Sequence, residues 1–108
     1  MDGDTLMERK AENSSRIGDI AEFYAVTWFW DQGYEVFLNP GSSGMADMVI
    51  YKDGKTTLID IKHLRRDLRV DKNWYVKNGR TPKQKEHGVQ LVGFHPETRK
   101  CRFVEHHA

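Results

Sequence analysis

The chain has 108 residues, of which 38% are hydrophobic and 11% aromatic, so it can form one hydrophobic core but not a second domain. Its single cysteine, Cys101, excludes a disulfide framework and a cysteine-rich zinc module. No apolar run approaches the roughly 20 residues that a membrane span needs, so we expect one domain over residues 1–108 of a soluble, cytoplasmic protein that does not bind membranes.

The first predicted element is a long helix. Residues 1–13 are polar, and we expect them to be flexible. Ser14 or Ser15 would cap a helix that ends near Gln32, just before Gly33. The helix row expected to face a sheet is apolar or small apart from one carboxylate, and consists of Gly18, Glu22, Ala25, Val26 and Phe29.

Three strands should follow the helix. Residues 34–38 predict a short strand, and Gly41-Ser42-Ser43-Gly44 predicts a loop. Residues 47–62 predict a β-hairpin, because Asp53-Gly54 favours a tight turn and both flanks are rich in Val, Ile, Thr and Tyr.

The predicted hairpin carries a carboxylate on each strand, Asp47 and Asp60, and a lysine, Lys62, two residues after the second. Because side chains alternate across a strand, Asp60 and Lys62 point to one face and Ile61 to the other. By the same alternation His63 faces away from Lys62, and we expect it to be packed and not catalytic.

After Leu64 no regular element is predicted until Thr81-Pro82, where a helix cap and a proline at the first helical position begin a short helix over residues 83–87. Residues 89–94 and 101–104 predict two more strands. The order α-β-β-β-α-β, with one extra strand, predicts an α/β or α+β domain whose mixed central sheet is flanked by helices.

Positive charge is concentrated in one segment. Residues 62–85 hold nine Lys and Arg against two Asp, a net charge of +7, although the whole chain carries only +1. Trp74 and Tyr75 lie within this segment. A basic stretch with aromatic residues indicates a surface that binds the phosphate backbone of a nucleic acid, although charge runs can also simply face solvent.

Two carboxylates beside a lysine favour the binding of a divalent cation. Asp47 and Asp60 are hard oxygen ligands suited to Mg²⁺, for which Mn²⁺ should substitute. Lys62 would orient or deprotonate an attacking water and stabilise charge on a phosphate. The alternatives are that Asp47 only begins a strand, and that Asp60 and Lys62 form an exposed polar face.

These residues, in this order of elements, resemble the PD-(D/E)XK nuclease superfamily, whose restriction-endonuclease-like core is αβββαβ. Asp47 matches its second-strand Asp, Asp60 and Lys62 match its acidic residue and Lys on the third strand, and Glu22 matches its first-helix Glu. Ala46 stands where the family has proline, and Asp60 where Glu is commoner.

Within that superfamily, the sequence looks most like archaeal-type Holliday-junction resolvases and related phage and repair nucleases. Three segments carry this similarity: Gly18-Asp19-Ile20-Ala21-Glu22, Gly33-Tyr34-Glu35-Val36 and Gly44-Met45-Ala46-Asp47.

The resemblance implies further roles. The backbone carbonyl of Ile61 would complete the metal site and Glu22 would act through a water, while Gln84 or Lys85 would touch the scissile phosphate. The expected DNA-binding residues are Lys62, Arg65, Arg66, Arg69, Lys72, Lys77, Arg80, Lys83, Gln84 and Lys85, with Ser42 and Ser43 as hydroxyl donors unless they only form a loop.

We therefore expect a Mg²⁺-dependent endonuclease that hydrolyses DNA phosphodiester bonds, with branched DNA formed in recombination or repair as a candidate substrate. Resolving a junction would require a homodimer or higher oligomer, since two strands must be cut symmetrically. The alternatives are a homing, restriction or single-strand nuclease, and a catalytically inactive nucleic-acid-binding module of the same fold.

Overall fold

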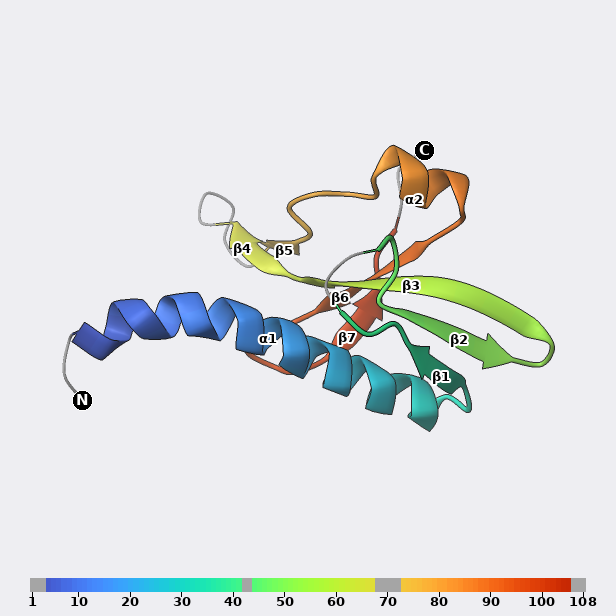
Figure 1. The fold of residues 1–108 in the computed structure, drawn as a ribbon, viewed down its shortest axis with the longest axis horizontal. Helices are drawn as coiled ribbons and strands as arrows, with labels where there is room; N and C mark the ends of the chain where they lie inside the picture. Colours follow the sequence, from blue (N-terminus) through green and yellow to red (C-terminus); the bar gives the residue numbers. More distant parts are fainter. Residues whose placement is uncertain (1–3, 42–43, 68–72, 106–108) are drawn as a thin grey trace.

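The computed structural model describes residues 4–41, 44–67 and 73–105, with side chains described outside residues 4–15, 67 and 73. Helices and strands follow one another as shown in Figure 1. In chain order they are α1 (Asp4–Asp31), β1 (Glu35–Leu38), β2 (Met48–Lys52), β3 (Lys55–His63), β4 (Arg65–Asp67), β5 (Asn73–Tyr75), α2 (Pro82–Glu86), β6 (Gln90–Phe94) and β7 (Cys101–Phe103).

Five strands form one mixed sheet in the order β1-β2-β3-β6-β7, which confirms the predicted fold class. Only β3 and β6 are parallel; the other neighbours are antiparallel. Parallel neighbours need a long connection, so the chain leaves the sheet after His63 and returns at Gln90. The pair β4–β5 and helix α2 lie on this connection, which contains most of the basic segment.

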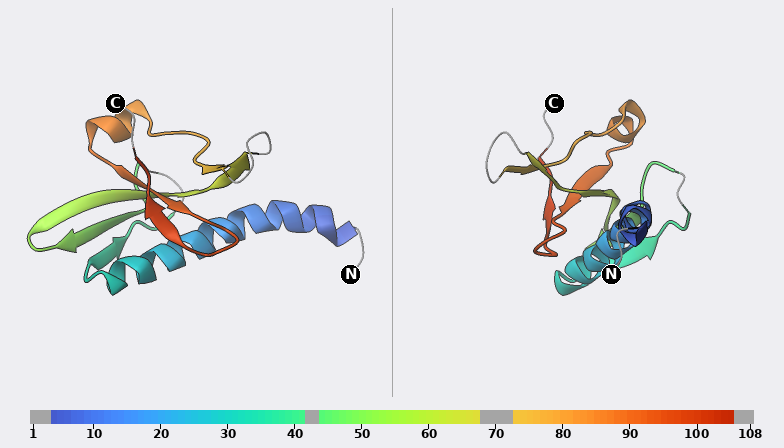
Figure 2. Two further views of the ribbon diagram at one scale, coloured as in Figure 1. Left: turned by 180° about the vertical axis from the view of Figure 1, so that it is seen from behind. Right: turned by 90° about the vertical axis from the view of Figure 1, so that its left-hand side faces the viewer.

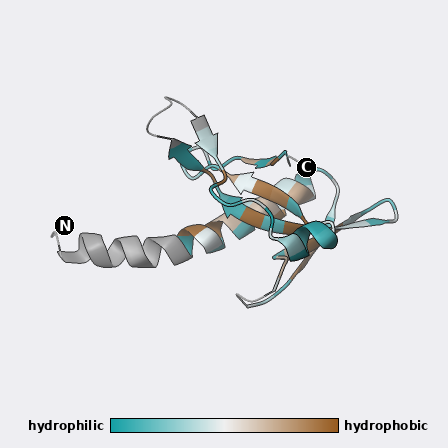
Figure 3. Cartoon of the chain, turned by 90° about the horizontal axis from the view of Figure 1, so that it is seen from above, coloured by the Kyte–Doolittle hydropathy of each residue, from teal (hydrophilic) through white to brown (hydrophobic). Residues whose placement is uncertain are grey.

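Helix α1 covers one face of the sheet, and α2 lies on the other side of the strands (Figures 1 and 2). Ala25, Val26 and Phe29 are buried against Met48 and Ile59 of the sheet, as the helix row predicted. Hydrophobic colour gathers on the central strands in Figure 3, whereas α2 is hydrophilic. Among the described helices, none combines the length and apolarity needed to cross a membrane.

Two predicted features of the chain are wrong. Helix α1 begins at Asp4, within the segment expected to be flexible, and not at Ser14 or Ser15. Residues 4–13 contain several strong helix formers and neither Gly nor Pro, which explains the earlier start. Residues expected to form an irregular basic loop instead pair as β4 and β5, whose three-residue strands are too short to show an alternating pattern.

The predicted hairpin turn and the short second helix are confirmed. Asp53 and Gly54 have φ angles of 53° and 81°, the left-handed values that a tight hairpin turn requires. Thr81 caps α2 through a capping box: its hydroxyl accepts from the Gln84 N–H, and the Gln84 side-chain oxygen accepts from the Thr81 N–H. Pro82 occupies the first helical turn.

Leu64 packs across β6 and holds the end of β3 in place. A Cβ atom on Gly93 would lie 2.6 Å from Leu64 Cδ2 and 3.3 Å from Val104 Cγ2, so glycine is required for this approach. The Leu64 N–H also donates to the Phe94 carbonyl, at 2.8 Å. Because Gly93 is the register partner of Lys62, this contact fixes the strand end that carries the lysine.

We predict that Gly93→Ala lowers the free energy of unfolding by about 1–3 kcal/mol, because the added methyl overpacks the Leu64 side chain. Gly79→Ala is the matched control, since a Cβ at Gly79 would meet nothing within 4 Å, and it should change stability by no more than about 0.5 kcal/mol. Urea denaturation measures both variants. Equal stability of the two would show that Leu64 does not constrain β6.

Candidate active site

Asp47 lies where β2 and β3 separate. The last register pair of this ladder is Met48 with Ile59, and the Asp47 N–H donates to the Ile59 carbonyl at 2.8 Å. Beyond that pair, β3 is hydrogen-bonded by the Asp47 side chain and not by the backbone of β2. The Asp47 Oδ2 accepts from the Ile61 N–H at 2.7 Å. The side chain is therefore fixed at the open end of the hairpin, directed at β3.

Asp60 reaches the same place from β3. It is 9% exposed, and its Oδ2 accepts from the Gln84 side-chain amide at 3.0 Å and lies 3.3 Å from Lys62 Nζ. Its carboxyl group interacts directly with that of Asp47. The predicted convergence of Asp47, Asp60 and Lys62 is thus present in the structure.

The closeness of the two carboxyl groups changes the acidity of Asp47. Burial raises the pKa of Asp47 from 3.8 to about 7, and the neighbouring Asp60 and the charge of Glu22 act in the same direction. The hydrogen bond from the Ile61 N–H partly opposes this rise. The pair is therefore held together against its own repulsion, which a proton or a cation would relieve.

Two connected hollows flank these residues. Glu22, Asp47, Ile61 and His63 help to line one of about 670 Å³, between α1 and the loop after β1. Lys62 lines the second, of about 260 Å³, together with Ile61, His63, Arg65, Val76, Lys77 and Asn78. Because both share Ile61 and His63, they adjoin, and we call the two together the Asp47–Lys62 groove, which runs from α1 to the basic segment.

The oxygen donors fit a Mg²⁺ or Mn²⁺ ion. Among the described residues, no three His, Cys, Asp or Glu side chains converge closely enough to enclose a metal by themselves. Mg²⁺ does not require such a cage, since it keeps several waters and usually binds one or two carboxylates plus substrate phosphate. The pair Asp47 and Asp60 supplies that number of hard ligands.

The Ile61 carbonyl can join this pair. In a β-strand the N–H and C=O of one residue point to the same side, and the Ile61 N–H points to Asp47. The carbonyl oxygen of Ile61 is therefore also directed to the side on which Asp47 lies. This geometry supports the ligand that the sequence resemblance implied.

Gln84, which the sequence resemblance gave with Lys85 as a candidate contact to the scissile phosphate, is buried in the structure. It is 6% exposed, and its side-chain nitrogen donates to Asp60 and, at 2.8 Å, to the Met45 carbonyl. Its oxygen is engaged in the capping box with Thr81. Gln84 therefore orients the Asp60 carboxylate and ties α2 to the loop before Asp47.

The remaining predicted DNA-binding residues are divided between two sides of the connection. Lys62, Arg65 and Lys77 line the Asp47–Lys62 groove, whereas Arg80 and Lys85 line a separate pocket. Arg66 on β4 and Lys83 on α2 are exposed. Ser42, Ser43, Arg69 and Lys72 lie outside the described residues.

His63 is a groove residue that the sequence prediction missed. It does point away from Lys62, toward α1, where its Nε2 lies 3.9 Å from the position of a Cβ built on Gly18. Burial lowers the pKa of His63, and the charges of Arg65 and Lys62 lower it further, which favours the neutral ring. The small residue at position 18 was the sequence signal for the space that the ring borders.

Comparison with known proteins supports this fold. No protein-family model matches the chain, and no curated protein matches it in sequence. A solved structure of a bacterial homing endonuclease, I-Ssp6803I, is similar over 81% of this chain, with a TM-score of 0.63 and 19% sequence identity. The chain spans 61% of the length of that protein chain. This similarity shows that the two proteins share a fold.

Proposed function

We propose that the protein is a metal-dependent endonuclease that hydrolyses phosphodiester bonds in DNA. The observation that carries the proposal is the contact between the Asp47 and Asp60 carboxyl groups, with Lys62 Nζ 3.3 Å from Asp60. Such a cluster opposes folding, and strongly perturbed acids in a groove are typical of functional sites. The fold shared with a homing endonuclease supports the same class of activity.

The residues of the groove would have different roles in cleavage. Mg²⁺ or Mn²⁺, held by Asp47, Asp60 and the Ile61 carbonyl with Glu22 acting through a water, would supply Lewis acidity to the scissile phosphate. Lys62, whose side chain is 40% exposed, reaches the groove and would orient or deprotonate the attacking water. Arg65 and Lys77 would bind the flanking backbone phosphates.

Branched DNA is the substrate that the sequence resemblance favours, and cutting it symmetrically would require a dimer or higher oligomer. A homing endonuclease is a second candidate, favoured by the structural similarity to I-Ssp6803I. The two differ in whether the DNA is recognised by its shape or by its sequence.

Cleavage assays on plasmid, single-stranded and four-way-junction DNA test the proposal. We expect cleavage with Mg²⁺ or Mn²⁺, none with a chelator, and little with Ca²⁺, whose larger and looser coordination shell positions water less well. Binding without cleavage of any substrate in any of these metals would instead support the inactive DNA-binding module.

Asp47→Asn should abolish cleavage and at the same time stabilise the metal-free protein. The amide keeps an acceptor for the Ile61 N–H but carries no charge. Because the folded pKa of about 7 exceeds 3.8, the wild type loses stability as the pH rises from about 4 to 7, and the variant does not. Thermal unfolding of the wild type and the variant over this pH range, in the presence of a chelator, measures the difference in stability.

The gain in unfolding temperature over the wild type should be larger at pH 8 than at pH 5. A variant less stable than the wild type at pH 8 would show that the Asp47 charge is not repelled in the fold.

Gln84→Ala should raise the Mg²⁺ concentration needed for half-maximal cleavage by about 10- to 100-fold, as expected when a residue that orients a metal ligand is lost. Thr81→Ala is the matched control: it weakens the cap of α2 by about 1 kcal/mol but leaves the contact between Gln84 and Asp60 in place. Single-turnover cleavage rates measured over a range of Mg²⁺ concentrations distinguish the two variants. The same metal dependence in both variants would reduce Gln84 to a structural role.

A further inference from the structure

A further pocket lies on the face of the sheet opposite α1. Its volume is about 680 Å³, and Leu91 of β6 and Val104 form part of its wall. Val92, the neighbour of Leu91, packs in the core under α1, so alternation directs Leu91 to the opposite face. The chain from Tyr75 to Arg80 closes the other side, and we call this space the β5–β7 pocket.

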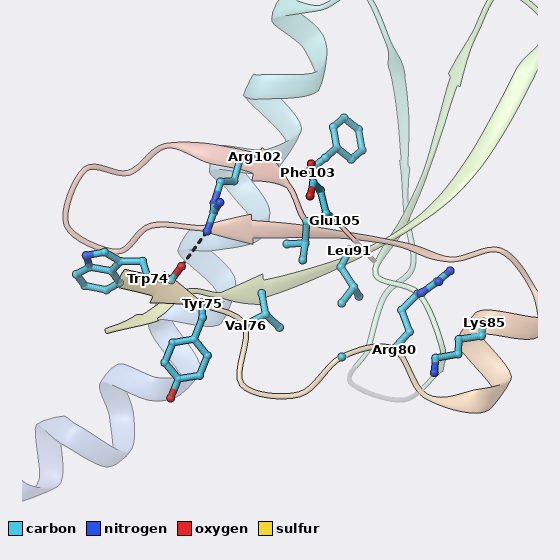
Figure 4. Close-up of a pocket in the computed structure, with 11 residues that line it drawn as sticks. Trp74, Tyr75, Val76, Arg80, Lys85, Leu91, Arg102, Phe103 and Glu105 are labelled. Atoms are coloured by element: carbon cyan, nitrogen blue, oxygen red, sulfur yellow. Dashed lines mark hydrogen bonds between the residues drawn. The ribbon is translucent and has the colours of Figure 1, made fainter. Parts of the chain in front are cut away.

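Two basic side chains lie on one side of the β5–β7 pocket, and aromatic side chains together with Arg102 lie on the other. Figure 4 shows Arg80 and Lys85 on one side of Leu91, with Trp74 and Tyr75 on the other. Three cations, including Arg102, line the pocket against one carboxylate, that of Glu105. The pocket therefore attracts an anion.

Both guanidinium groups are held in place by backbone contacts. Arg102 Nη2 donates to the Trp74 carbonyl at 2.9 Å, and Arg80 Nη1 donates to the Val89 carbonyl at 3.3 Å. A guanidinium has five N–H donors, so each of these contacts leaves donors for a ligand. Lys85 is exposed on α2 and adds a third positive charge.

The aromatic side of the pocket offers a surface for stacking. Tyr75 is 40% exposed, so its ring is accessible. The Trp74 ring packs against the His95 ring, with ring centroids 4.0 Å apart. Cations beside open aromatic rings match the two parts of a nucleotide, its phosphate and its base. A base in a duplex is stacked on its neighbours, so an unpaired base matches this surface better.

The β5–β7 pocket adjoins the Asp47–Lys62 groove. Val76 lines both. Leu91 is the register partner of Asp60, and Lys85 follows Gln84, whose side chain contacts Asp60. A DNA strand in the groove could therefore continue into the pocket past the segment that contains Val76.

We propose that the β5–β7 pocket binds an unpaired nucleotide of the DNA substrate, with its phosphate at Arg80 and Lys85 and its base on Tyr75. The choice of DNA as ligand rests on the proposed nuclease function. The pocket gives the protein a preference for DNA with a single-stranded part, which binding without cleavage can measure.

The test compares affinities for a short single-stranded oligonucleotide and a blunt duplex of the same sequence, by fluorescence anisotropy in chelator. The double variant Tyr75→Ala with Lys85→Gln should weaken single-strand binding at least about fivefold and duplex binding less. The matched control is Tyr51→Ala with Lys55→Gln, which alters an equally exposed tyrosine, 38% against 40%, and an exposed lysine on the β2–β3 hairpin. It should leave the single-strand affinity unchanged.

Unchanged single-strand affinity in the pocket variant, or an equal loss for both DNA forms, would overturn the proposal. Loss of an oligomer by light scattering with single-strand affinity unchanged would identify the pocket as a protein interface. Lys85→Glu alone, at an exposed position, should also weaken single-strand binding and serves if the double variant misfolds. A wild type that cuts no DNA but shows the predicted loss would reject the nuclease proposal and leave the pocket standing.

Discussion

The contact between the carboxyl groups of Asp47 and Asp60 is the constraint on which the rest of the site depends. Two like charges meet because β2 and β3 separate just before them, which frees the Ile61 N–H to bind Asp47. Gln84 and Lys62 then hold the other carboxylate from opposite ends of the connection between β3 and β6. A cation bound at the two carboxyl groups would account for each of these contacts.

The parallel pairing of β3 and β6 explains where the basic residues lie. It forces the chain out of the sheet for 26 residues, from Leu64 to Val89, and this excursion carries β4, β5 and α2. One side of it borders the Asp47–Lys62 groove, with Arg65 and Lys77, and the other borders the β5–β7 pocket. A single crossover thus supplies cations to both.

Local sequence signals predicted the parts of the site that depend on short-range geometry. Asp53-Gly54 fixed the hairpin turn, and strand alternation placed Asp60 and Lys62 together. Thr81 and Gln84 have the spacing of a capping box, a signal that the expected phosphate contact of Gln84 or Lys85 did not take into account for Gln84. Its second partner, Asp60, lies 24 residues away and could not be predicted without the crossover.

The other omissions have the same cause. Arg102 contacts the backbone of Trp74 across 28 residues, and this contact joins β7, at the edge of the five-stranded sheet, to β5 of the two-stranded sheet. A single sequence gives no register for such contacts.

Thermal unfolding of the wild type at pH 8, with and without Mn²⁺, tests the central claim most directly, because a cation that binds only the folded carboxylate pair must stabilise the folded protein. The account predicts a rise in unfolding temperature that grows with Mn²⁺ concentration and disappears in Asp60→Ala; an absent shift in the wild type, or an equal shift in Asp60→Ala, would contradict it.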